Sequence, residues 1–176
     1  MSEVGTSSPG DRAAAVVRLL EAAGHTVATA ESLTGGCLGA ALTAVPGASR
    51  VYRGGVIAYA TELKHQLLGV DAALLARVGA VDARVAAMMA EGVRDRLAAD
   101  YGVATTGVAG PDPQDGHPPG TVWVAIATPG TTVVVDASVA TPADRAAVRR
   151  STVLTALTQL AVVLRRDREE PKVVGR

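Results

Sequence analysis

The sequence predicts a three-layer α/β/α domain with a mixed sheet. Short runs rich in Val, Ala and Thr alternate with longer stretches in which apolar residues recur at helical spacing. Gly and Pro residues that favour turns separate these runs. Hydrophobic residues make up 48% of the 176 residues and charged residues 19%, which is enough apolar side chain for one buried core. Alternating strands and helices favour a sheet that is covered on both faces.

The first elements follow in order along the chain. Apolar periodicity predicts a helix over 11–23, which Gly24 ends, and a strand at 26–30. Residues 31–36 (ESLTGG) predict a turn into a second helix at 37–45. The next expected elements are a strand at 56–59 and helices at 61–68, 71–78 and 82–99, with Thr61 and Asp82 as N-caps.

The second half of the chain predicts a hairpin and a long helix. A strand at 103–106 precedes a loop at 107–120, and two strands at 121–128 and 132–140 flank Pro129-Gly130. Thr141 as N-cap, Pro142 and Asp144 then start a helix that runs to about Arg166. The predicted organisation is a flexible leader (1–10), a single domain (11–166) and a charged tail (167–176).

Charge and composition argue against several classes of protein. The 17 basic residues balance the 17 acidic ones, whereas a nucleic-acid-binding surface usually carries a basic excess. The first ten residues lack the pattern of a signal peptide, and the apolar runs are interrupted before they reach the length of a membrane span. Cys37 is the only cysteine, which excludes an internal disulfide and a cysteine-rich metal site. We therefore expect a cytoplasmic protein that binds neither nucleic acid nor membrane.

Polar or glycine-rich loops follow three predicted strands, at 31–36, 59–64 and 106–120. Ligands of α/β folds bind beyond the carboxyl ends of the strands, so we expect these loops to form one site. Ser32 lies between a strand and a glycine turn, a suitable place for a nucleophile, and nearby backbone N–H groups could bind a phosphate or an oxyanion. The alternative is a tight turn in which Ser32 and Thr34 act only as caps.

Lys64 is the only lysine of the predicted domain, since 15 of the 17 basic residues are arginines and Lys172 lies in the tail. A lysine can lose its proton when it is desolvated, whereas an arginine cannot. Lys64 is therefore a better candidate base for Ser32 than any of the three histidines, and Tyr59 could orient either group. The alternatives are chance retention of a surface lysine and simple packing of Tyr59 against the sheet edge.

The loop after 103–106 contains two glycines that permit close approach of the backbone to a ligand, Gly107 and Gly110. Its fourteen residues make it long for a passive connection. Asp112 and Asp115 have no further ligands at a suitable spacing, so we interpret them as turn residues rather than as a metal site.

Three arginines lie on the final helix, Arg145, Arg149 and Arg150. The first two are four residues apart and share one face. Arginine suits a phosphate or a carboxylate, so any of the three could bind an anionic ligand. The alternative is a solvated face paired with acids such as Asp144.

These motifs resemble, in order, those of one known family. The matching segments are Thr29–Gly36, Val45–Ser49, Arg53–Tyr59 with Lys64, Leu68–Val70, Gly79–Val81, Thr106–Asp112, Gly120–Trp123, and Asp144–Arg145 with Val148–Arg149. The ordered set resembles the C-terminal domain of the CinA (competence/damage-inducible) proteins, which also occurs as stand-alone nicotinamide mononucleotide amidohydrolases. The resemblance covers about residues 11–165.

The resemblance implies hydrolysis of nicotinamide mononucleotide to nicotinic acid mononucleotide and ammonia, within pyridine nucleotide salvage. It implies Ser32 as nucleophile, Lys64 as base and Tyr59 as their neighbour. The residues expected to bind the nucleotide are Glu31, Thr34, Gly35, Gly36, Thr106, Gly107 and Arg145. It implies no cofactor and no metal, and we expect a homodimer.

The chain departs from the family pattern at several positions. Leu33 stands where Cys is frequent, Ala60-Thr61 replaces Ser-Asn, and Asp82 replaces Ser. Pro113-Gln114 replaces Gly-Gly, which stiffens the loop and could alter substrate choice or weaken activity. This departure favours the first alternative, a non-catalytic nucleotide-binding or regulatory module of the same fold. A partner in DNA uptake or repair is a second alternative, and the balanced charge argues against it.

Overall fold

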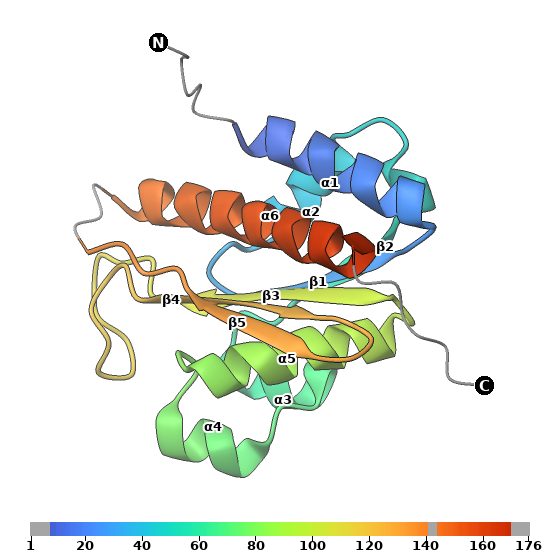
Figure 1. The fold of residues 1–176 in the computed structure, drawn as a ribbon. Helices are drawn as coiled ribbons and strands as arrows, with labels where there is room; N and C mark the ends of the chain where they lie inside the picture. Colours follow the sequence, from blue (N-terminus) through green and yellow to red (C-terminus); the bar gives the residue numbers. More distant parts are fainter. Residues whose placement is uncertain (1–7, 141–143, 170–176) are drawn as a thin grey trace.

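The computed structural model describes residues 8–140 and 144–169, and Figure 1 shows their arrangement. Six α-helices, one short 3-10 helix and five strands form in this part of the chain. Their order is α1 (Pro9–Ala23), β1 (Val27–Glu31), α2 (Cys37–Thr43), η1 (Ala48–Arg50), β2 (Tyr52–Ile57), α3 (Thr61–Leu68), α4 (Ala72–Val78), α5 (Ala83–Arg96), β3 (Tyr101–Gly107), β4 (Val122–Ala127), β5 (Thr132–Asp136) and α6 (Arg145–Glu169).

The five strands form one mixed sheet in the order β2-β1-β3-β4-β5. Strand β1 pairs in parallel with both β2 and β3, so the carboxyl ends of these three strands lie at one edge of the sheet. Strands β4 and β5 continue the sheet as an antiparallel hairpin. The predicted α/β fold with a mixed sheet is confirmed.

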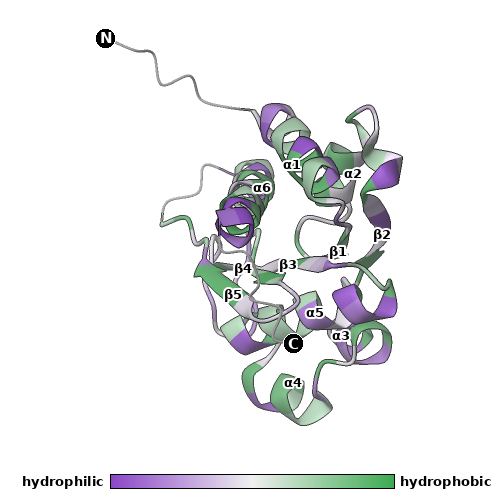
Figure 2. Cartoon of the chain, turned by 45° about the vertical axis from the view of Figure 1, so that its right-hand side comes forward, coloured by the Kyte–Doolittle hydropathy of each residue, from purple (hydrophilic) through white to green (hydrophobic). Residues whose placement is uncertain are grey.

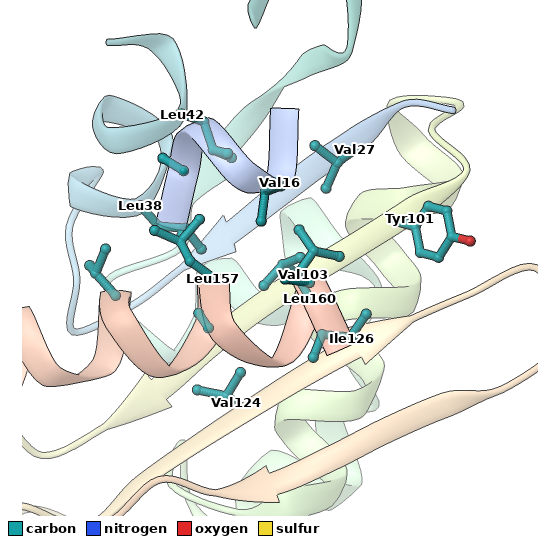
Figure 3. Close-up of a cluster of buried hydrophobic side chains, with 14 of the residues drawn as sticks. Val16, Val27, Leu38, Leu42, Tyr101, Val103, Val124, Ile126, Leu157 and Leu160 are labelled. Carbon is teal, nitrogen blue, oxygen red and sulfur yellow. The ribbon is translucent and has the colours of Figure 1, made fainter. Parts of the chain in front are cut away.

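Helices cover both faces of this sheet. Helices α1, α2 and α6 lie on one face and α3, α4 and α5 on the other (Figure 1). The first layer packs on the larger of two buried apolar clusters, where side chains such as Leu38, Val103 and Leu157 meet (Figure 3). The second cluster contains small strand residues and the inner face of α5. The helices of both layers carry both hydrophilic and hydrophobic residues (Figure 2), as helices with one face on a core and one face in solvent do.

Helix α6 is the one helix of the described residues that is long and apolar enough to cross a membrane by length and composition. Its buried residues, which include Val148, Leu157 and Leu164, pack on the sheet and against α1. Half of the apolar window is buried inside the protein. Helix α6 is therefore a core helix of the domain, and its packing explains why its hydropathy is high.

Strand β2 differs from the prediction, because it spans Tyr52–Ile57 instead of 56–59. Gly54 and Gly55, which the predicted strand did not include, lie in the observed strand and pair with Ala28 and Thr29 of β1. A Cβ atom at Gly55 would overlap the hydroxyl of Thr29. Glycine at this position therefore permits close contact between strands rather than a change of direction.

Three helix starts also differ from the prediction. Ser8 caps α1 and forms a capping box with Asp11, so the helix includes residues that we expected in a flexible leader. Helix α3 has Ala60 at its N-cap position, which makes Thr61 the first helical residue instead of the cap. Thr141 and Pro142 lie outside the described residues. The carboxylate of Asp144 accepts the N–H of Ala147 at 2.6 Å, so Asp144 caps the start of α6.

Close packing of α5 against α3 predicts an unusual effect of one substitution. Gly→Ala in an exposed helix normally stabilises a protein by about 1 kcal/mol. At Gly92, however, the new Cβ atom would overlap the carbonyl oxygen of Leu68. We expect Gly92→Ala to lower the free energy of unfolding by about 1–3 kcal/mol, measured by urea denaturation. The matched control is Gly10→Ala in α1, where the nearest atom would be 3.6 Å away, and which should not destabilise the protein.

Candidate active site

A cavity of about 560 Å³ lies beyond the carboxyl ends of the three parallel strands. Its volume is in the range that binds small molecules. The residues that line it are Ser32, Leu33, Tyr59, Ala60, Thr61, Gly107, Val108, Ala109, Gly110, Pro111, Asp112, Pro113, Gln114 and Arg145. The three loops that the sequence pointed to therefore meet at one site, and the start of α6 joins them.

Ser32 and Lys64 are in direct contact at this cavity. Lys64 Nζ lies 3.1 Å from Ser32 Oγ and donates to the carbonyl oxygen of Ala58 at 2.8 Å. Ser32 follows β1, while Lys64 comes from the first turns of α3 and is fully buried. Ser32 lines the cavity, whereas Lys64 is buried behind the lining and reaches the serine hydroxyl.

Burial changes the chemistry of Lys64. Loss of hydration disfavours the ammonium form and lowers the pKa of Lys64 to about 8, although the carboxylates of Asp115 and Glu62 oppose this shift. Lys64 makes no ion pair with any described residue, so no adjacent counter-ion holds its proton. Roughly one tenth of the molecules would carry a neutral amine at pH 7. A neutral amine at this distance can accept the proton of Ser32.

Glu31 occupies a different place from the one expected of a nucleotide ligand. Its side chain is 2% exposed and does not line the cavity. The carboxylate accepts the backbone N–H groups of Gly36, Leu38 and Gly39 at 2.8–3.0 Å. It therefore caps the start of α2 and fixes the turn that carries Ser32.

The backbone N–H groups of Gly35 and Gly36 form hydrogen bonds within the turn itself. Gly36 N–H donates to Glu31 and Gly35 N–H donates to the carbonyl oxygen of Ser32, so neither is free to bind an oxyanion. Thr34 is fully buried, and its hydroxyl bonds that of Thr105 at 2.8 Å. Among the described residues, the N–H of Leu33 has no acceptor, and Leu33 lines the cavity.

The end of β3 provides one wall of the cavity. Gly107 lines it, as expected, whereas Thr106 is buried and donates its hydroxyl to the carbonyl oxygen of Ala80 at 2.7 Å. Asp115 accepts the N–H of the same Ala80 at 2.9 Å. This contact supports the interpretation of Asp115 as a turn residue rather than a metal ligand. No group of three or more His, Cys, Asp or Glu side chains could hold a metal ion within residues 8–140 and 144–169.

Tyr59 and Arg145 form the rim of the cavity. The tyrosine side chain is 59% exposed, and its hydroxyl accepts a hydrogen bond from Arg145 at 2.8 Å. Arg145 also donates to the carbonyl oxygen of Gly110 at 2.7 Å. Tyr59 therefore contacts Arg145 and makes no hydrogen bond to Ser32 or Lys64 in this structure.

The three arginines of α6 have different surroundings. Arg145 alone among them lines the cavity. Arg149 donates to the carbonyl oxygen of Thr34 and to the sulfur of Cys37, both at 3.0 Å, so it supports the turn after Ser32 from outside. Arg150 borders a separate apolar hollow beside α2. An anionic ligand in the cavity would therefore meet Arg145.

Sequence reasoning missed two features of this site. One is the carbonyl oxygen of Ala58, which accepts from Lys64 and has no side-chain signal. The other is the hydrogen bond that the carboxylate of Asp115 accepts from the N–H of Ala80, although the Asp115-Gly116 dipeptide indicates a tight hairpin turn. Pro113 and Gln114, the departure noted above, lie in the cavity wall.

Comparison with known proteins identifies the family. The CinA C-terminal domain matches residues 10–164. The chain belongs to this family. A CinA-like protein from Frankia casuarinae is 54% identical over 142 residues, and one from Gloeobacter violaceus is 49% identical over 149. The aligned regions cover 81% and 84% of this chain but only 32% and 35% of those relatives, so this CinA-family chain spans about a third of their length.

Solved structures of CinA-family proteins have the same fold. A CinA superfamily protein from Klebsiella pneumoniae is 34% identical, with a TM-score of 0.86 and coverage of 91% of this chain and 99% of that one. The competence/damage inducible protein CihA from Agrobacterium tumefaciens is 33% identical, with a TM-score of 0.85 and coverage of 94% and 99%. The fold of this chain is therefore that of the CinA C-terminal domain.

The lowered pKa of Lys64 predicts how stability depends on pH. As the pH falls from 10.5 to 8, the unfolded chain binds a proton at this lysine before the folded protein does, so the folded state loses stability. Lys64→Met removes this titration. As the pH falls from 10.5 to 8, we expect the free energy of unfolding of the variant to increase by about 3 kcal/mol relative to that of wild type. Urea denaturation followed by circular dichroism measures it, and a constant difference would contradict the prediction.

Proposed function

We propose that this CinA-family chain is an amidohydrolase that converts nicotinamide mononucleotide to nicotinic acid mononucleotide and ammonia. The observation that carries the proposal is the contact between a buried lysine amine and a serine hydroxyl at the floor of a cavity. A serine and a neutral lysine form a nucleophile and base pair that suits attack on a carboxamide. Membership of the CinA family supports the choice of substrate.

The first half of the reaction forms an acyl-enzyme. Lys64 Nζ takes the proton of Ser32 Oγ, and the oxygen attacks the carboxamide carbon of the ligand. The carbonyl oxygen becomes an oxyanion, for which the free N–H of Leu33 is the donor adjacent to the nucleophile. When the C–N bond breaks, the lysine returns its proton to the nitrogen, and ammonia leaves.

In the second half of the reaction, water is the nucleophile and Ser32 is the leaving group. Lys64 takes a proton from water, the resulting hydroxide attacks the ester carbon, and the C–O bond to Ser32 breaks. The lysine then returns the proton to Ser32, and the acid is released. The carbonyl oxygen of Ala58, 2.8 Å from Nζ, holds one N–H of the amine so that its lone pair can face the serine.

The rim of the cavity suits a nucleotide. The guanidinium of Arg145 is a donor of the kind that binds phosphate. Within the part of the chain that the structure describes, it donates to a tyrosine hydroxyl and a backbone carbonyl, which an anion could displace. The exposed ring of Tyr59 stands beside it and offers a flat surface to a ligand. The chain therefore provides an anion site at the rim and a nucleophile at the floor.

Removal of the nucleophile tests the proposal directly. Ser32→Ala should lower ammonia release from nicotinamide mononucleotide at least a thousandfold, because no other group in the contact can form the acyl-enzyme. The matched control is Ser49→Ala, an exposed serine outside the cavity, which should retain wild-type activity. Binding of the nucleotide by folded wild-type protein without ammonia release would instead favour the regulatory module.

The role of Lys64 predicts a pH dependence. Since the base must be neutral, kcat/KM should rise with pH about tenfold per pH unit below a midpoint near 8, and then level off. Lys64→Arg should lose about 100-fold or more in activity, because arginine keeps the charge but does not release its proton. Ammonia release between pH 6 and 9.5 measures both effects. An active Lys64→Arg protein, or a rate that falls as the pH rises to 8, would rule out lysine as the base.

A further inference from the structure

One wall of the cavity is a small ordered hairpin. Gln114 and His117 exchange two backbone hydrogen bonds, at 3.1 and 2.9 Å. Between them, Asp115 and Gly116 both have positive φ angles, +51° and +79°, as a two-residue type I′ turn requires. Residues 111–114, which line the cavity, lead directly into this turn. The conformation of the wall is therefore set by the turn.

Asp115 attaches the hairpin to the rest of the domain. Its carboxylate accepts the N–H of Ala80, between α4 and α5, at 2.9 Å. A Cβ atom at Gly79 would lie 2.6 Å from the same carboxylate, so the residue before Ala80 must be small for this approach. The carbonyl oxygen of Ala80 accepts the hydroxyl of Thr106. One peptide segment thus joins the hairpin wall to the end of β3.

The same carboxylate acts on the lysine base. Two carboxylates raise the pKa of Lys64 against the effect of burial, Asp115 from the hairpin and Glu62 from the same helix, and Asp115 has the larger influence. Four other charged or titratable groups near this part of the site have partners of their own. Arg145 and Tyr59 bond each other, His65 bonds the carbonyl oxygen of Val70, and Arg96 of α5 bonds that of Gln66.

We propose that Asp115 is a positioning residue for this reaction: its carboxylate, held by the N–H of Ala80, fixes the hairpin wall of the cavity. The inference rests on the proposed function, because it assigns Asp115 to the same site. The carboxylate never touches the substrate in this scheme. It sets the position of the cavity wall relative to the end of β3.

Two substitutions separate the charge of Asp115 from its anchoring role. Asp115→Asn removes the charge but keeps a side-chain oxygen for the N–H of Ala80, and Asn-Gly is itself a favoured type I′ turn. Asp115→Ala removes the charge and the anchor together, and alanine is disfavoured at a positive φ angle. The matched control is Asp112→Asn, which removes one charge from the same loop at a residue that does not act on the pKa of Lys64.

The pH profile of kcat/KM for nicotinamide mononucleotide is the first measurement. For Asp115→Asn we expect the midpoint to fall by roughly 0.5 to 1 on the pH scale with KM unchanged, whereas Asp112→Asn should keep the wild-type midpoint. For Asp115→Ala we expect the same lower midpoint and a KM that is raised several-fold. A wild-type midpoint in Asp115→Asn, or an equal shift in Asp112→Asn, would overturn the charge role. An unchanged KM in Asp115→Ala would overturn the anchoring role.

A second readout does not depend on the substrate. Phenylmethylsulfonyl fluoride sulfonylates a reactive serine: the oxygen–sulfur bond forms, fluoride leaves, and the base takes the proton. The rate at which Ser32 is labelled is measured by mass spectrometry at several pH values, and the midpoint of this rate reports the pKa of the same base. If the protein releases no ammonia but the labelling midpoint falls in Asp115→Asn alone, the proposed substrate is wrong and the effect of the Asp115 charge on Lys64 stands. If ammonia is released and KM is unchanged in Asp115→Ala, the positioning role of Asp115 is wrong and the proposed function stands.

Discussion

A buried amine without an adjacent counter-ion is the constraint on which this site depends. Burial of a charged lysine is costly, and among the described residues only two oxygen atoms, from Ser32 and Ala58, form hydrogen bonds with its nitrogen. The surrounding layer of helices must therefore hold the amine in place against its own tendency to reach water. The second apolar cluster, which lies on this side of the sheet, provides that support. Burial of Lys64 lowers the stability of the fold, and it leaves an amine of the basicity that the proposed hydrolysis of an amide needs.

Two buried ionisable side chains, Glu31 and Lys64, lie on either side of Ser32, and the fold gives them different partners. Glu31 is satisfied by three backbone N–H groups at the start of α2, so its negative charge is compensated within the turn. Lys64 approaches Ser32 from α3 on the other side of the sheet. If the two side chains paired with each other, the lysine would be held in its charged form. Their separation leaves a carboxylate that shapes the backbone and an amine that can exchange a proton.

The sequence was sufficient to predict the fold class. It was also sufficient to predict that the loops after three strands meet at one site, because neighbouring parallel strands place their carboxyl ends together. It was insufficient where a residue acts through its neighbours in space. Glu31 and Thr106 have the chemistry of ligands, yet long-range packing turns both inward. The glycine pair was left out of the predicted β2 because the close contact of Gly55 with Thr29 of β1 leaves no mark in the local sequence. Asp115 was placed correctly in a turn, but its reach to Ala80 depends on a distant loop.

The peptide at Ala80 links parts of the protein that are far apart in sequence. Its N–H is held by the hairpin wall and its carbonyl by the end of β3, while its chain neighbours lead into α4 and α5. A displacement of the corner between these two helices would therefore move two sides of the cavity together instead of opening one of them. Sequence variation in α4, which contributes no residue to the cavity lining, can thus change the shape of the binding site while the reacting groups stay in place. Under the proposed function, the corner between α4 and α5 is therefore a place where a change of sequence would alter the fit of the substrate without replacing any residue of the cavity lining.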